Sequence, residues 1–170
     1  EFTNPAAPDV AQPRIVNAIY YATDGLNGRR GADSGEPATA GSASPPNHLL
    51  LVQGPLTLDW RHRRGGILPR LDNASLHAGF MATPDRARRW IDAAIHVRGR
   101  PDQRFVKLHT HGCQDGTLES LLEGALDSLQ QAFQHVTAER DGARFFWRTP
   151  WEATQLIHEL EAGPAAATLA

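Results

Sequence analysis

The chain has 170 residues, of which 41% are hydrophobic and 21% charged, and its formal net charge at pH 7 is −2. This length favours a single domain with one core. The nearly balanced charge argues against nucleic acid as a partner, because a phosphate-binding surface normally carries an excess of Lys and Arg. The one basic run, residues 61–64, is interpreted as a solvated turn.

Cys113 is the only cysteine, so the chain cannot form an internal disulfide, and it does not look like a small secreted scaffold. The spacing His-x-His-x-Cys is not typical of structural zinc sites, so we interpret Cys113 as a small buried side chain. No run approaches the ~18 apolar residues of a membrane span, and the N-terminus lacks a signal peptide. The sequence therefore predicts no membrane partner and, by default, a cytoplasmic location.

We expect a flexible lead-in at residues 1–13, one α/β domain at residues 14–163 and a short tail at residues 164–170. Residues 14–22 are β-branched and aromatic and predict a first strand. The Gly- and Pro-rich residues 23–47 predict a long loop. An apolar run at 48–53, an alternating pattern at 56–60 and a short piece at 67–69 predict further extended segments.

A regular alternation of helices and strands is predicted after Thr83. Thr83-Pro84 is a helix start, and the apolar spacing that follows predicts a helix that ends at Gly99. A strand at 105–108, a long helix at 118–136 and a second strand at 143–147 come next. A capping box at 149–152 then predicts a last helix that stops at Gly163.

This alternation predicts a parallel sheet with right-handed crossovers, and so an α/β protein. A closed eight-stranded barrel typically takes ~250 residues, so the chain is too short to form one. Two architectures remain open: an open sheet, or the later part of a larger barrel.

The strongest functional signal is His109-Thr110-His111-Gly112, which follows the apolar residues 105–108 directly. Ligands bind at the carboxyl ends of strands in α/β folds, so two histidines there can face a common ligand. Such a pair suits metal-activated water attacking a carbonyl, with His109 or His111 as general acid. Asp59 and Asp115 are the candidate carboxylates, although Asp115 is interpreted first as a helix cap.

Four segments of the chain together resemble the C-terminal portion of bacterial polysaccharide deacetylase-like proteins: residues 53–56, 99–102, 106–112 and 149–152. The resemblance implies a distorted (β/α) barrel that removes N-acetyl groups from carbohydrate with a divalent metal, for which zinc is expected. It implies that His109 is the catalytic acid and that Asp59, in an Asp-Trp motif with Trp60, supports it. His111 would be a metal ligand or a substrate contact, and Trp60 a substrate contact.

The paired aspartates and the His-x-x-x-His segment of that family are absent from this sequence. They belong to the N-terminal half of the family's barrel. We therefore predict a fragment of a metal-dependent hydrolase for N-acetylated carbohydrate that is inactive alone. The alternative is a non-catalytic module that binds carbohydrate or protein, and exposed sheet edges would then favour a homo-oligomer.

Overall fold

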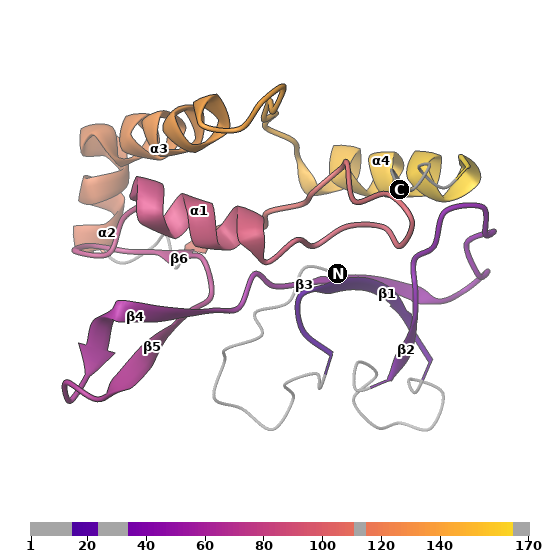
Figure 1. Cartoon of the computed structure of the whole chain (residues 1–170), viewed down its shortest axis with the longest axis horizontal. Helices are drawn as coiled ribbons and strands as arrows, with labels where there is room; N and C mark the ends of the chain where they lie inside the picture. The colour runs from indigo at the N-terminus through magenta and orange to yellow at the C-terminus, as the bar shows by residue number, and fades with distance from the viewer. Residues whose placement is uncertain (1–14, 24–33, 111–114, 165–170) are drawn as a thin grey trace.

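The computed structural model describes residues 15–23, 34–110 and 115–164, so the predicted lead-in and nearly all of the predicted tail lie outside the described residues. The described part is a mixed α/β structure (Figure 1). Its strands are β1 (Ala18–Ala22), β2 (Gly35–Pro37), β3 (Leu49–Gln53), β4 (Thr57–Arg64), β5 (Leu68–Asp72), β6 (Ser75–Leu76) and β7 (His109–Thr110). Its helical segments are α1 (Pro84–Asp92), α2 (Asp115–Ser120), η2 (Leu121–Ala125), α3 (Leu126–Ala138) and α4 (Pro150–Ala162).

The prediction of a parallel sheet is wrong for the largest sheet of the structure, which has three strands. Strands β2, β1 and β3 form an antiparallel sheet in that order, and β4 and β5 form a separate antiparallel ribbon. Of the pairings between the strands named above, only that of β6 with β7 is parallel. The described sheets do not close into a barrel.

The helix starts are confirmed better than the helix lengths. The Thr83 hydroxyl accepts a hydrogen bond from the Arg86 amide at the start of α1, and Thr149 and Glu152 form the predicted capping box of α4. Helix α1 ends at Asp92 and not at Gly99 as predicted. Ala94, two residues beyond its end, has a positive φ of 52°. The predicted long helix is interrupted at Gly124, whose φ of 103° is not helical.

Neither residues 105–108 nor residues 143–147 form a strand. The first segment runs between two core clusters: Phe105 packs against the cluster that contains Ile95 and Ile157, and Val106 packs against the cluster that contains Trp90. Its apolar residues are therefore explained by burial on both sides and not by strand pairing. Phe145 in the second segment likewise packs against the Trp90 cluster.

The two larger core clusters hold the helices against each other and against the sheet, which gives the layers visible in Figure 1. Ile157 and Leu160 of α4 pack with Ile19 and Val52, so α4 covers one face of the β2–β1–β3 sheet. Helices α1 and α3 enclose the other cluster through Trp90 and residues such as Phe133. The β4–β5 ribbon projects from the end of the molecule opposite the sheet (Figure 1), so much of its surface is accessible to a partner.

Candidate functional site

The β4–β5 ribbon presents two different faces, because side chains alternate along a strand. Asp59 of β4 and Asp72 of β5 point inward and are 0% and 1% exposed. Leu58 and Leu71 are opposite one another in the register and are both exposed. We call the side with the two aspartates the inner face and the side with the two leucines the outer face.

Asp72 is held on the inner face by α1. Nε and Nη2 of Arg86 donate to its two carboxylate oxygens at 2.8 Å each, and Trp90 Nε1 and the Ala74 amide also donate to Oδ1. Burial alone raises the pKa of the Asp72 carboxyl, but the hydrogen bonds and charge of Arg86 outweigh it and hold that pKa below its usual value. Asp72 is therefore an ionised carboxylate in the core.

Every nitrogen of the Arg86 guanidinium donates at least one hydrogen bond in this arrangement. Its remaining donors reach the carbonyl oxygens of Phe80, Met81 and Ser75 at 2.7 to 3.0 Å. Its guanidinium carbon lies 3.7 Å from the centre of the Phe80 ring. A buried cation with a bidentate carboxylate and three carbonyl acceptors is a rigid structural element, so it fixes the base of the ribbon on α1.

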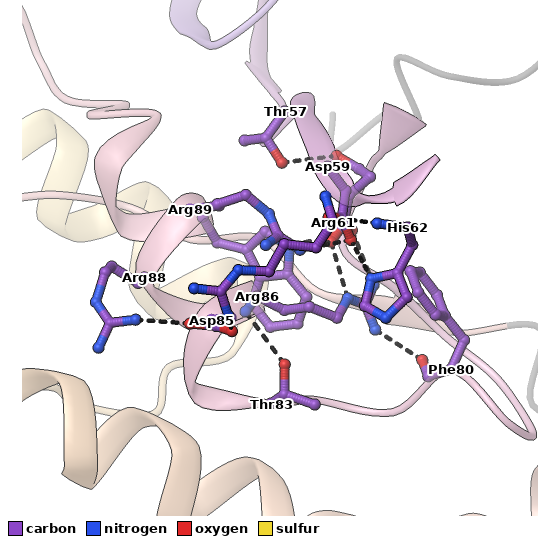
Figure 2. A network of polar contacts seen from close by, with 12 residues as sticks. Thr57, Asp59, Arg61, His62, Phe80, Thr83, Asp85, Arg86, Arg88 and Arg89 are labelled. Atoms are coloured by element: carbon purple, nitrogen blue, oxygen red, sulfur yellow. Dashed lines mark hydrogen bonds and ion pairs between the residues drawn. The ribbon is translucent and has the colours of Figure 1, made fainter. Parts of the chain in front are cut away.

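Asp59 is held by a second set of donors, drawn in Figure 2. Arg89 Nη2 lies 3.0 Å from Asp59 Oδ2 and 3.5 Å from Asp72 Oδ2, so one guanidinium joins the two carboxylates. The backbone amides of Arg61 and His62 donate to Asp59 Oδ1. Burial raises the pKa of the Asp59 carboxyl, but the His62 side chain, these amides and the Arg89 charge together lower it.

His62 is a functional candidate that the sequence reasoning missed. Its Nδ1 lies 2.8 Å from Asp59 Oδ2, and its side chain is 70% exposed. Because the ionised Asp59 can only accept, Nδ1 of His62 carries the proton and Nε2 keeps a lone pair when the ring is neutral. A buried carboxylate thus orients an exposed imidazole, and the spacing Asp59-x-x-His62 was the only sequence signal for it.

His109 is placed beside this network by the parallel pairing of β6 and β7. It pairs with Ser75, and its amide donates to the Ala74 carbonyl oxygen at 3.3 Å. The Ala74 amide in turn donates to the Asp72 carboxylate, so Ala74 links the backbone of His109 to Asp72. The partners of Asp59 within the described residues are Arg61, His62 and Arg89, so the structure does not join Asp59 to His109 directly.

The other predicted site residues do not take part in the network around Asp59 and Asp72 within the described residues. Trp60 is 57% exposed and follows the buried Asp59, so the Asp-Trp motif sends its two side chains in different directions. Arg63 donates to the Trp60 carbonyl and lies 5.8 Å from the Trp60 ring. His111 and Cys113 lie outside the described residues. Asp115 is in the first turn of α2, as expected of a residue at a helix start.

Lys107 is a second residue that the sequence reasoning missed. Its Nζ is buried and makes no hydrogen bond to any described residue, and burial lowers the pKa of this ammonium to about 8. The signal was a single lysine inside the apolar residues 105–108, two positions before His109. A buried amine with a depressed pKa is a common feature of functional sites.

No three His, Cys, Asp or Glu residues in ranges 15–23, 34–110 and 115–164 are grouped so that they could hold a metal ion. The described residues, which do not include His111, therefore do not form a site that fits the zinc that the resemblance implies. Within the same ranges, no helix is both long and apolar enough to cross a membrane. What the arrangement offers is proton exchange at the exposed ring of His62, which a carboxylate orients, whereas both ring nitrogens of His109 are buried.

Comparison of the chain with family models, curated proteins and solved structures finds no match in any of the three.

Proposed function

We propose that the chain is part of a hydrolase that resembles the polysaccharide deacetylases and acts on N-acetylated carbohydrate. His109 is its catalytic acid, and the chain alone is inactive. The observation that supports this is the place of His109 in β7, which pairs in parallel with the strand that follows Asp72. The same pair supports the further proposal that the chain is the later part of a larger (β/α) barrel.

The chemistry that His109 would supply is proton donation. Hydrolysis of an N-acetyl amide adds water across the C–N bond and releases acetate and an amine. The leaving nitrogen must gain a proton as the bond breaks, and a protonated imidazole supplies it at near-neutral pH. The exposed His62 ring on the ribbon, oriented by the buried Asp59, could bind a hydroxyl group of the carbohydrate.

Binding can be tested without turnover. We expect an N-acetylglucosamine oligosaccharide to shift the ring resonances of His109 in a heteronuclear NMR titration. The matched glucosamine oligosaccharide, which lacks the acetyl groups, should shift them much less. The variant His109→Gln should bind the acetylated oligosaccharide more weakly, while His48→Gln, a change at an exposed histidine remote from the ribbon, should not.

Two results would contradict the proposal. One is the absence of any His109 shift at millimolar acetylated oligosaccharide. The other is an equal response to the acetylated and deacetylated oligosaccharides, because the site would then not recognise the group that the reaction removes.

A non-catalytic carbohydrate-binding module is the second candidate, and the exposed ring of Trp60 favours it. Exposed aromatic rings can stack on sugar rings, and Trp60 is 57% exposed beside the outer face of the ribbon. The same titration separates the two candidates. If Trp60→Ala abolishes oligosaccharide binding and His109→Gln leaves it unchanged, the binding module is favoured over the hydrolase.

A further inference from the structure

The tip of the β4–β5 ribbon combines exposed apolar and basic side chains. Ile67 and Leu68 are 77% and 66% exposed, and they follow the exposed Arg63 and Arg64 across a two-glycine turn. Neither arginine forms an ion pair within the described residues; Arg63 lies over Trp60, and no interaction of the Arg64 side chain is seen. The tip is therefore a cationic apolar surface that nothing in the described chain neutralises.

A second surface has the opposite charge. We call residues 115–127, which comprise α2, η2 and the first residues of α3, the acidic arm. Leu118 and Leu122 are 47% and 78% exposed and lie before the break at Gly124, and Leu126, which is 59% exposed, lies after it. Large exposed apolar side chains that gather in one segment often mark a surface that contacts a partner.

Four carboxylates lie in the same segment as these leucines. Asp115, Glu119, Glu123 and Asp127 are all exposed, and none of them forms an ion pair with another described residue. The arm therefore presents apolar and anionic side chains together, whereas the ribbon tip presents apolar and cationic ones. The two surfaces are complementary in charge and alike in hydrophobicity.

We propose that these surfaces bind each other between two copies of this chain, the ribbon tip of each copy packing on the acidic arm of the other. The ribbon and α2 lie at the same end of the long axis in Figure 1. A two-fold axis at that end lets both contacts form at once, so that the assembly closes as a dimer. Pairing of two ribbons alone is disfavoured, because it would bring arginines of like charge together. This inference does not depend on the proposed catalytic role of His109.

The first measurement is sedimentation velocity of the whole chain over a series of concentrations. We expect a monomer–dimer equilibrium in 50 mM salt that weakens at 500 mM salt, because screening reduces attraction between exposed charges. A chain that stays monomeric at the highest concentration overturns the proposal. So does a monomer that sediments with anionic lipid vesicles through Arg63 and Arg64, because the tip would then dock on lipid.

Charge reversal then tests the two surfaces. The variants Arg63→Glu/Arg64→Glu and Glu119→Arg/Glu123→Arg should each raise the dimer dissociation constant by about tenfold or more. The control Arg144→Glu/Arg148→Glu changes the net charge by the same amount as the ribbon variant, away from both surfaces, and should dimerise as the unaltered chain does.

Mixing the two reversed variants gives the decisive result. Each reversed surface then meets a complementary one, so the mixture should recover a dimer that neither variant forms alone. Recovery would also show that both variants are folded. If the mixture stays monomeric, or if either reversal leaves the dissociation constant unchanged, the proposed pairing is wrong.

Discussion

Asp72 is the residue on which the position of the ribbon most depends. It is 1% exposed and accepts hydrogen bonds from Arg86, Trp90 and Ala74. Removing one partner of a buried ion pair leaves the other charge uncompensated, which typically costs several kcal/mol. Asp72 thus contributes to stability through its pairing, and its low pKa makes that contribution dependent on pH.

We expect Asp72→Ala to lower the free energy of unfolding by about 3–5 kcal/mol, because it strands the buried Arg86 cation. Urea unfolding at pH 7 measures this. Asp102→Ala removes the carboxylate of an exposed pair with Arg100 and should change stability far less. Equal losses in the two variants would contradict the role given to burial. The Asp72 contribution should also decline as pH falls, since a depressed folded pKa means that acid protonates the unfolded carboxyl first.

Lys107 makes stability depend on pH in the alkaline range, and in the same sense as Asp72 does in acid. Burial lowers its folded pKa to about 8, against a usual value of 10.5. Between these two values the unfolded chain binds a proton that the folded chain has lost, so stability rises with pH across this window. Lys107→Met should therefore be more stable than the unaltered chain at pH 7, and the difference should shrink by pH 10. Urea unfolding of both proteins at several pH values measures it, and a difference independent of pH would contradict the prediction.

At the scale of elements, the helix α4 depends on its capping box. The Thr149 hydroxyl accepts from the Glu152 amide, and the Glu152 carboxylate accepts from the Thr149 amide at 2.7 Å. Thr149→Ala should cost about 1 kcal/mol of unfolding free energy, because the first turn loses an acceptor for its free amides. The matched control is Thr154→Ala, whose hydroxyl bonds only the Pro150 carbonyl within the same helix. Thermal unfolding compares the two, and an equal effect would show that the cap is not responsible.

The same scale shows why some predicted elements failed. Capping depends on residues that are neighbours in sequence, so Thr83 and Thr149 could be identified from sequence alone. The predicted strand at 105–108 failed because an apolar run reports burial, and burial can come from two flanking clusters instead of a neighbouring strand. The break at Gly124 was visible as a glycine, but a glycine inside a helical pattern does not by itself predict a positive φ.

At the scale of the whole molecule, the described core consists of three clusters, of which two join helices to one another or to the sheet. The Ile19 and Ile157 cluster joins the sheet to α4, and the Trp90 and Phe133 cluster joins α1 to α3. The segment that precedes His109 connects them, since Phe105 packs on the first cluster and Val106 on the second. The segment that leads into β7 is therefore anchored in both clusters.

The sequence by itself determined the mixed α/β class, the ends of helices that carry local capping signals, and His109 and Asp59 as candidates. These follow from local chemistry: hydroxyl caps, short apolar runs and polar residues after them. Only the tertiary structure decided that the main sheet is antiparallel and that Asp59 orients His62. Strand pairing and ion pairing join residues that are distant in sequence or that lie on an irregular ribbon, so their partners are set by packing and not by spacing.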